Sequence, residues 1–179
     1  MKRLTLLRHA KSGEDGAIAR DFDRQLNGKG RRAARTIGRH MRDADLRYDA
    51  VVASPAVRVE ETLAEVRAGY GAPLDPQWER RIYMASTDEL LDLVRETPNE
   101  AASLLLVGHN PGLEQLVLLL TPERDDDTRD KIEEKYPTAS LAELTFDVDR
   151  WADVTEGSGS LTRFVRPRDL DPELGPDRP

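Results

Sequence analysis

Residues Lys2–Ser12 read KRLTLLRHAKS, an apolar run over Leu4–Leu7 that stops at Arg8 and His9. A short apolar run bounded by charged residues is typical of an interior strand in a parallel sheet. Arg8 and His9 would then lie at the carboxyl end of this strand, where open α/β sheets form their ligand crevices. A guanidinium beside an imidazole at such an edge suits phosphate chemistry.

The composition is that of an acidic protein without cysteine. The 179 residues include 27 Lys and Arg against 34 Asp and Glu, and the net charge of −7 argues against a nucleic-acid-binding protein. No apolar run reaches membrane-spanning length and no signal peptide precedes the first strand, so we expect a cytoplasmic protein with no membrane partner. The absence of cysteine excludes disulfides, thiol catalysis and cysteine-ligated metals. Imidazole chemistry must therefore use His9, His40 or His109.

Two further apolar runs, Tyr48–Ala53 and Ser103–Val107, end in the same kind of polar group. Helical patterns separate the three runs, which predicts βαβ units, a parallel sheet and right-handed crossovers. The carboxyl ends of such strands share one edge of the sheet. The groups that we expect at this edge are Arg8 and His9 after the first strand, Ser54 and Arg58 after the second, and His109 and Asn110 after the third.

Helical patterns connect these strands and cover the sheet. Apolar residues at three-to-four spacing predict helices after Asn27, after Ser54–Pro55, after the capping box Ser86–Glu89, over Leu113–Leu120 and, as a short surface helix, within Pro122–Lys135. Ser54 and Asn110 are possible caps of two of these helices, and Pro111 is predicted as a first helical residue. Gly13–Asn27 shows no periodicity and is a long loop, whereas Gln77–Ala85 is a short connector.

The last two strands complete the fold class. Leu141–Val148 and Ser160–Arg166 follow strand patterns and are joined through a glycine-rich turn, so they can pair antiparallel at a sheet edge. We therefore expect an α/β three-layer sandwich, with a mostly parallel central sheet, helices on both faces and an antiparallel edge from the C-terminal strands. One domain spans residues 1–167. Residues 168–179 form a Pro- and acid-rich tail, and we expect the chain to fray from Pro167 onward.

The groups at the strand ends indicate a phosphate site. Two guanidiniums and two imidazoles that face one point would create a strongly positive hole, which requires an anion. Arginine forks match phosphate oxygens, so we expect Arg8, Arg58 and His109 to bind phosphate, and a phosphate or sulfate ion to occupy the pocket. Ser54 and Asn110 either orient this pocket or cap their helices. The sequence holds no HExxH spacing and no P-loop lysine, so the predicted chemistry uses no metal and no cofactor, and a histidine is the convincing nucleophile.

These residues also carry a family resemblance. LLRHAKS (Leu6–Ser12), SPAVRVEET (Ser54–Thr62) and VGHNPGLEQL (Val107–Leu116) resemble the motifs of the histidine phosphatase superfamily, also called phosphoglycerate-mutase-like. DFDRQLNGKG (Asp21–Gly30) and YPTASLAEL (Tyr136–Leu144) are similar, more narrowly, to the small phosphohistidine phosphatases of the SixA type. The resemblance covers the chain from its start to about Pro167.

The resemblance implies catalytic roles for the residues that match the motifs. His9 is the residue that attacks phosphorus in line and becomes a transient phosphohistidine, which water then hydrolyses. Arg8, Arg58 and His109 hold the equatorial oxygens, over which the transition-state charge spreads. The third position of the first motif, glycine in the family, is Ala10 here. The turn at Ala10 must therefore be compatible with a negative φ or be mildly strained.

The proton donor stays open among three carboxyl groups. Superfamily members with a strong acid carry a glutamate after the second helix, and Glu79 occupies roughly that place, although an exposed loop acid beside arginines describes it equally well. Asp21 and Asp23 in the long first loop are its rivals. Arg24 in the same loop is a candidate for steering substrate, and a solvated charge is the commoner explanation.

The predicted function is that of a metal-free phosphatase that dephosphorylates phosphohistidine on a protein partner. Imidazole has a solution pKa of ~6.5 and leaves with less proton assistance than an alkoxide. An active site with a weak or absent proton donor therefore favours P–N over P–O substrates. Few residues are available for a lid, which suits a phosphohistidine displayed on another protein. The alternatives are a small-molecule phosphomonoesterase on the same scaffold and, in a different class, a non-catalytic phosphoprotein-binding module. Binding alone would not require His9.

Overall fold

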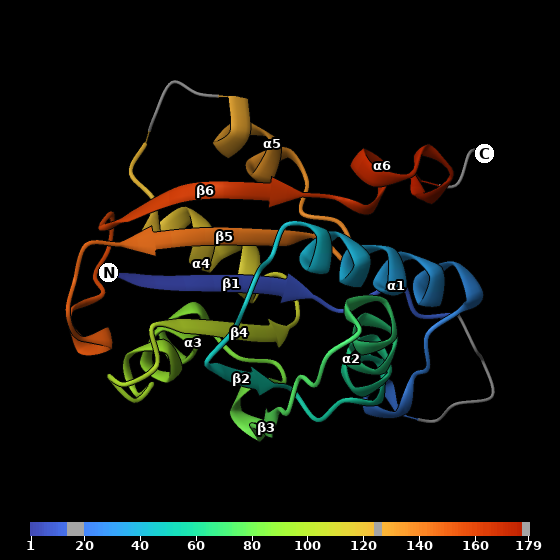
Figure 1. Ribbon diagram of the computed structural model, residues 1–179, viewed down its shortest axis with the longest axis horizontal. Coiled ribbons are helices and arrows are strands. Elements are labelled where there is room, and N and C mark those ends of the chain that lie inside the picture. The colour runs from blue at the N-terminus through green and yellow to red at the C-terminus, as the bar shows by residue number, and fades with distance from the viewer. Residues whose placement is uncertain (14–19, 124–126, 177–179) are drawn as a thin grey trace.

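The computed structural model describes residues 1–13, 20–123 and 127–176, and within these ranges the chain forms a six-stranded sheet in the order β3-β2-β4-β1-β5-β6 (Figure 1). The strands are β1 (Lys2–Arg8), β2 (Ala50–Ala53), β3 (Gln77–Trp78), β4 (Ser103–Gly108), β5 (Leu141–Phe146) and β6 (Gly159–Val165). The pairs β1–β4, β2–β4 and β2–β3 are parallel, whereas β1–β5 and β5–β6 are antiparallel. The mostly parallel sheet with an antiparallel edge is therefore confirmed.

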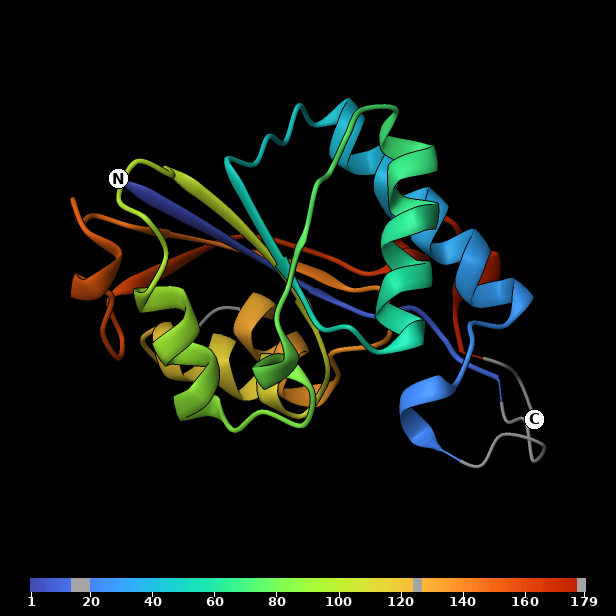
Figure 2. The same ribbon diagram turned by 90° about the horizontal axis from the view of Figure 1, so that it is seen from below.

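Helices cover both faces of this sheet. They are α1 (Gly28–Asp43), α2 (Val57–Tyr70), α3 (Thr87–Arg95), α4 (Gly112–Leu120), α5 (Asp127–Glu134) and α6 (Pro167–Leu170), with 3-10 turns η1 (Asp21–Asp23), η2 (Arg80–Ile82), η3 (Trp151–Asp153) and η4 (Pro172–Leu174). α1 and α2 lie against one face, and α3, α4 and α5 lie against the other (Figure 2). The three-layer sandwich is thus confirmed. No helix in the described ranges is long and apolar enough to cross a membrane.

Two hydrophobic clusters fill the space between the layers, one on each face of the sheet. Leu4 and Leu6 of β1 belong to the cluster that contains residues of α3 and α4, and Leu7 belongs to the cluster that contains residues of α1 and α2. Because both faces of β1 are covered, its sequence is a continuous apolar run and not an alternating one. β1 lies between β4 and β5, so Arg8 and His9 follow a central strand.

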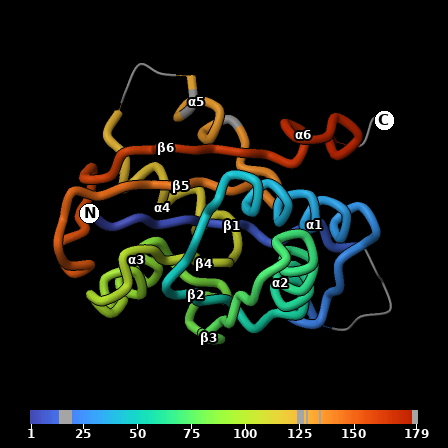
Figure 3. The backbone as a smooth tube through the Cα atoms, viewed as in Figure 1, coloured from blue at the N-terminus to red at the C-terminus, as the bar shows by residue number. Residues whose placement is uncertain are grey.

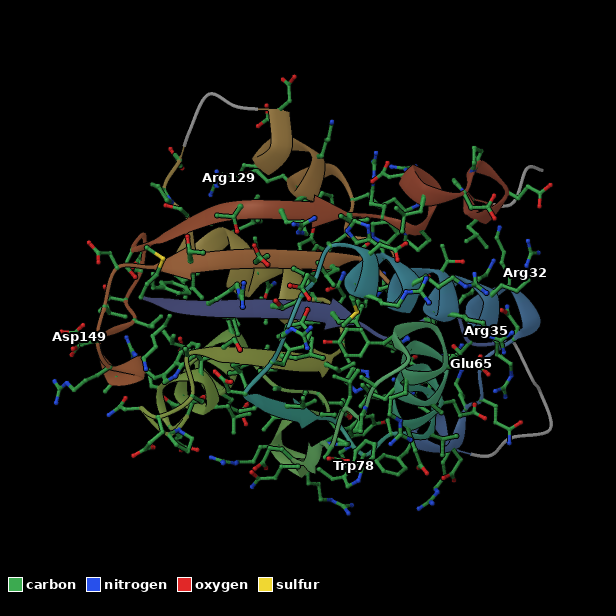
Figure 4. All side chains as sticks on the ribbon, in the orientation of Figure 1. Arg32, Arg35, Glu65, Trp78, Arg129 and Asp149 are labelled. Carbon is green, nitrogen blue, oxygen red and sulfur yellow. The ribbon has the colours of Figure 1, made fainter. Side chains whose placement is uncertain are left out.

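Two glycines allow α1 and α2 to approach closely. A Cβ atom at Gly38 would lie 2.2 Å from the carbonyl oxygen of Val66. A Cβ atom at Gly69 would lie 2.1 Å from that of Arg35. Arg35 and Glu65 lie side by side across the same two helices (Figure 4), with Nη2 2.7 Å from Oε2. The tight packing fixes the position of α2, whose first turn enters the site described below.

Two predicted boundaries differ from the structure. Gln77–Trp78 forms an edge strand within the segment expected to be a connector, because two exposed residues carry no periodicity from which a strand could be predicted. α4 begins at Gly112, so Pro111 precedes the helix and is not its first residue. The N-cap position is Pro111, so the expected cap Asn110 lies one residue earlier, where its Oδ1 accepts a hydrogen bond of 3.2 Å from the N–H of Glu114.

Two irregular segments are described in part. Residues 14–19 of the expected loop Gly13–Asn27 lie outside the described ranges, as do residues 124–126 of Pro122–Lys135. The first segment contains η1 and the second contains α5. Ile132 of α5 is fully buried in the cluster shared with α4. This helix is therefore anchored to the core and is more than a surface helix.

The described end of the chain is folded. Residues 167–176 form α6 and η4 and lie beside α1 (Figure 3). Leu174 is buried in the cluster under α1, and Lys29 donates a hydrogen bond to the carbonyl oxygen of Gly175. The expectation of fraying is wrong for these residues, because a Pro- and acid-rich composition conceals a single buried leucine that anchors the segment. Residues 177–179 lie outside the described ranges.

Candidate active site

The carboxyl ends of β1, β2 and β4 meet at one edge of the sheet. The backbone N–H groups of His9 and Ser54 both donate hydrogen bonds to β4, over 3.0 and 3.1 Å, which places the three strand ends side by side. The ring centroids of His9 and His109 lie 5.3 Å apart. Arg58 Nη2 lies 3.3 Å from Nδ1 of His109. The structure therefore brings together groups that the sequence predicts at three separate strand ends.

His9 is buried with one ring nitrogen unprotonated. Its Nδ1 lies 2.7 Å from the carbonyl oxygen of Ala10. A carbonyl oxygen only accepts, so Nδ1 carries the hydrogen, and Nε2 keeps its lone pair in the neutral ring. Burial lowers the pKa of His9 to about 3; the hydrogen bond to Ala10 opposes this shift, and the charges of Arg8 and Arg58 reinforce it. At neutral pH the ring is uncharged and has a nitrogen suited to nucleophilic attack.

Ala10, the departure from the family motif, is accommodated without left-handed backbone. It is fully buried, and its φ is not positive. Its N–H donates a hydrogen bond of 2.9 Å to Thr62 Oγ1 on α2. The first of the two conformations expected for this turn, a negative φ, is therefore the one present.

His109 lies between Arg58 and Ser54. Because Arg58 only donates, Nδ1 of His109 accepts from it, and the neutral ring donates from Nε2 to Ser54 Oγ over 2.8 Å. Burial lowers the pKa of His109 to about 4, and the charge of Arg58 acts in the same direction. Ser54 is not the cap of α2, whose N-cap position is Ala56. Of the two interpretations of Ser54, the structure supports contact with the site.

The segment that follows α5 holds Arg8 in place. Arg8 Nη1 and Asn110 Nδ2 both donate hydrogen bonds to the carbonyl oxygen of Tyr136, over 2.9 and 3.0 Å. The N–H of Ala139, a residue with a φ of 60°, donates to the carbonyl oxygens of Arg8 and His9 over 3.1 and 3.0 Å. Burial lowers the pKa of Arg8. Asn110 thus contacts both the first turn of α4 and the segment that holds Arg8.

Asp21 supplies a negative charge to this cluster. Its Oδ2 lies 3.0 Å from Arg58 Nη2 and accepts a hydrogen bond of 2.8 Å from the hydroxyl of Tyr83. Its carbonyl oxygen accepts a second bond from Arg58, over 2.8 Å. Burial alone would raise the pKa of Asp21, but the bond from Tyr83 and the charge of Arg58 lower it to about 2. The positive hole expected from the sequence is therefore partly neutralised by the protein itself.

Glu79 is held by a neighbouring arginine. Its Oε1 accepts hydrogen bonds of 3.0 Å from both the N–H and Nε of Arg81, and Arg81 also bonds Glu96 at the end of α3. The hydrogen bonds from Arg81 lower the pKa of Glu79. Within the described part of the chain, no hydrogen bond or ion pair joins Glu79 to His9 or His109. The structure thus places this candidate proton donor in a surface ion-pair network.

The two remaining loop candidates have partners within the loop. Asp23 lies 2.7 Å from Arg20, on the exposed side of η1. Arg24 Nη1 lies 3.2 Å from Asp21 Oδ1 and so faces the same carboxylate as Arg58. Of the three candidates in this loop, Asp21 is in the cluster, Arg24 contacts the cluster through Asp21, and no hydrogen bond or ion pair among the described residues joins Asp23 to it.

Two aromatic residues that the sequence did not assign to the site lie against it. The ring of Tyr83 is 5.5 Å from that of His109 in an edge-on arrangement, and the ring of Phe22 is 5.1 Å from that of Tyr83. The Arg58 guanidinium carbon lies 6.0 Å from the Tyr83 ring centre. The only sequence signal that could have pointed to these two residues is that they lie near site candidates: Phe22 follows Asp21, and Tyr83 lies four residues after Glu79.

The assembled groups can bind a tetrahedral anion and attack it. Two neutral imidazoles, two guanidiniums, a serine hydroxyl and one carboxylate converge, and of the two unprotonated imidazole nitrogens the one on His109 accepts from Arg58, whereas Nε2 of His9 keeps its lone pair for attack. Among the residues with described positions, no three His, Asp or Glu side chains form a group that could hold a metal ion.

The lowered histidine pKa values predict a loss of stability on acidification. Between about pH 6.5 and 4 the unfolded chain protonates histidines of ordinary pKa ~6.5, whereas His9 and His109 stay neutral in the folded protein. The unfolded state then binds more protons, so stability falls as the pH falls, by up to about 1.4 kcal/mol per pH unit for each histidine. Urea unfolding at several pH values should show that the double variant His9→Gln/His109→Gln has a shallower slope than the wild type.

His40 on α1 is the matched control for this experiment. Burial and then Arg163 lower its pKa in the same direction, but it is less buried than the two site histidines. His40→Gln should therefore change the slope less than the double variant does. An unchanged slope in the double variant would show that the two site histidines titrate normally in the folded protein.

Comparison with known proteins agrees with this geometry. A family model described as histidine phosphatase superfamily (branch 1) matches residues 4–82. An uncharacterized protein of Mycobacterium tuberculosis is 34% identical over 164 residues, which cover 90% of this chain and 100% of that protein. A solved structure of a candidate phosphohistidine phosphatase SixA from Nakamurella multipartitia has a TM-score of 0.81 at 28% identity, covering 93% of this chain and 96% of the other. One from Agrobacterium tumefaciens has a TM-score of 0.77 at 28% identity, covering 92% and 97%.

Proposed function

The chain belongs to the histidine phosphatase superfamily and is a phosphatase, and from this premise we propose that it works through a phosphohistidine at His9 and acts on phosphohistidine displayed by a partner protein. The proposal has two parts, the covalent mechanism and the substrate class. The first rests on the unprotonated Nε2 of His9, and the second on the state of the carboxyl groups around it.

The proposed first step transfers the phosphoryl group to the enzyme. Nε2 of His9 attacks phosphorus, and the bond to the substrate nitrogen breaks with its electron pair going to that nitrogen, so the substrate ring, protonated on its other nitrogen, leaves as neutral imidazole. Arg8 and Arg58 stabilise the charge on the equatorial oxygens. Arg58 has five N–H donors, so it can bind phosphoryl oxygens while keeping part of its contact with Asp21.

The proposed second step regenerates the enzyme. Water attacks the phosphohistidine, the bond to Nε2 of His9 breaks, the lone pair returns to the ring, and the proton of the water goes to solvent. His109 contributes through the N–H of its neutral ring, which in the structure donates to Ser54 Oγ over 2.8 Å.

The observation that carries the substrate class is that the candidate proton donors are all paired with arginines. Asp21 has a pKa of about 2, Glu79 is held by Arg81, and Asp23 is paired with Arg20. An ionised carboxylate cannot deliver a proton to a departing group. Imidazole, with an ordinary pKa of ~6.5, leaves readily without such help, whereas an alkoxide does not.

The relatives support the same substrate class. Two solved structures at 28% identity are named as candidate phosphohistidine phosphatases, and both match nearly the whole chain. The cytoplasmic location expected from the sequence stays a prediction, as does the identity of the partner.

Phosphorus NMR tests the proposal directly. The purified protein is mixed with a phosphohistidine-bearing carrier protein and, in a second sample, with a panel of small phosphomonoesters. We expect the P–N signal to disappear and inorganic phosphate to grow, with the esters consumed far more slowly. Preferential hydrolysis of the esters would move the function to a small-molecule phosphomonoesterase, and no turnover of either substrate would favour the non-catalytic binding module.

A further inference from the structure

A cavity of about 360 Å³ lies beside the candidate active site. Arg8 lines it and so belongs to both. The walls come from four parts of the chain: the end of β1, the first turns of α1, the segment that follows α5, and the C-terminal segment that contains α6 and η4. Figure 1 shows that β6 leads into α6, which lies beside α1. A volume of this order is typical of sites for small molecules.

The lining is strongly basic. It includes six basic side chains, Arg8, Lys11, Lys29, Lys135, Arg166 and Arg168, and no acidic one, on a chain whose net charge is −7. Asp169 lies outside the lining and pairs with Arg166 at 2.9 Å. The Nε atoms of Arg8 and Arg168 are buried without a hydrogen-bond partner. So many like charges around one hollow are costly unless an anion occupies it.

We propose that this cavity binds a small molecule that carries two or more phosphate groups. Several cations in one small space exceed what a single carboxylate would neutralise, whereas a polyphosphate matches them in charge density. Arginine forks and lysine ammonium groups are the side chains that bind phosphate oxygens, and Ala33, Pro137 and Leu174 provide an apolar wall for the rest of the molecule. The four wall segments form a half-open hollow and not a flat face, which suits a small ligand better than an acidic segment of a protein.

The cavity site goes beyond the proposed function and stands independently of it. Arg8 joins the two sites, because its Nη1 is fixed on Tyr136, next to the cavity residues Lys135 and Pro137. The cavity can therefore be tested by binding alone, with no measurement of turnover. Failure of the phosphatase proposal would leave the binding result unaffected.

The test uses inorganic tripolyphosphate as the probe and the full chain as the receptor. Calorimetric titration should show that Lys135→Gln/Arg168→Gln binds tripolyphosphate roughly 10- to 100-fold more weakly than the wild type, since two charge-assisted contacts are lost. The matched control Arg42→Gln/Arg150→Gln removes the same charge from exposed ion pairs outside the cavity. It should bind tripolyphosphate within about threefold of the wild type, because exposed distant charges are screened by salt.

Backbone amide NMR of the wild type keeps the test valid if a variant fails to fold. Tripolyphosphate should shift the amide signals of Ala33, Thr138 and Gly175, which come from three walls of the cavity. If both double variants bound tripolyphosphate equally weakly, binding would depend only on long-range attraction between the anion and the protein's positive charges, and the proposal would be overturned. Tripolyphosphate shifts confined to the amides of His9 and His109 would also overturn it. So would shifts of the cavity amides that a polyglutamate peptide causes and tripolyphosphate does not, because they would indicate that the cavity docks an acidic protein.

Discussion

Replacing His9 with asparagine is expected to lower kcat for phosphorylated substrates by roughly 10⁴-fold or more, because it removes the nucleophile. The choice of asparagine is structural. In His9 the Nδ1–H donates to the carbonyl oxygen of Ala10 over 2.7 Å, and the side-chain amide of asparagine can donate from nearly the same place. The variant thus loses Nε2 and keeps the contact that orients the side chain. Steady-state turnover of phosphohistidine on a carrier protein measures the loss.

A trapping experiment separates a lost nucleophile from a damaged fold. Wild-type protein mixed with labelled substrate and quenched with alkali should carry a phosphoryl group on His9, whereas His9→Asn should carry none. Tungstate, a phosphate analogue, should still bind the variant within a few-fold of the wild type, since Arg8 and Arg58 remain. His40→Asn, a substitution on α1 outside the site, is the matched control and should behave as the wild type. Turnover by His9→Asn within tenfold of the wild type would exclude His9 as the nucleophile.

The sequence sufficed for the sheet edge because strand ends are a local signal. Leu4–Leu7 and Ser103–Val107 are apolar runs that stop at polar residues, and parallel pairing of β1 with β4 brings those residues together without further information. The 5.3 Å separation of His9 and His109 follows from this register. The two C-terminal strands could also be predicted, because their own residue patterns and the glycine-rich turn between them indicate an antiparallel pair.

The surroundings of that edge could not be read in the same way. Asp21 belongs to a segment without periodicity, and its contact with Arg58 depends on how the first loop folds back over α2. Tyr83 and Glu79 lie close together in sequence, yet the side chain of Tyr83 reaches His109 while that of Glu79 pairs with Arg81. Such choices are made by tertiary packing, because a short connector has no apolar face that fixes its orientation.

The basic cavity shows the same limit more strongly. Its cations are spread from Arg8 to Arg168 along the chain, and no single stretch is basic enough to indicate an anion site. The segment that closes it was expected to fray, since one buried leucine, Leu174, is too weak a signal against a Pro- and acid-rich composition. A site built from four distant segments becomes visible only when the fold is known.

Turnover is expected to fall steeply as the leaving group becomes more basic. Phosphohistidine and phosphotyrosine release groups with pKa values of ~6.5 and ~10, and phosphoserine releases an alkoxide, whose conjugate acid has a far higher pKa. An enzyme without an effective general acid forgoes a rate factor of roughly 10²–10⁴, which matters most for the last of these. We therefore expect kcat/KM for a phosphohistidine peptide to exceed that for the matched phosphoserine peptide by at least about 10³-fold.

Variants at the three carboxyl groups show whether one of them acts as the acid after all. Asp21→Asn should change turnover of all three peptides by one common factor, within about tenfold, because Asp21 orients Arg58 and does not protonate the leaving group. Glu79→Gln should change each by less than about threefold, and Asp23→Asn, on the same turn as Asp21 but paired with Arg20, is the matched control. A loss that grows from phosphohistidine to phosphoserine in either Asp21→Asn or Glu79→Gln would identify that residue as the proton donor. A P–N substrate would then no longer be favoured over an ester, because the site would hold the proton donor that an ester requires.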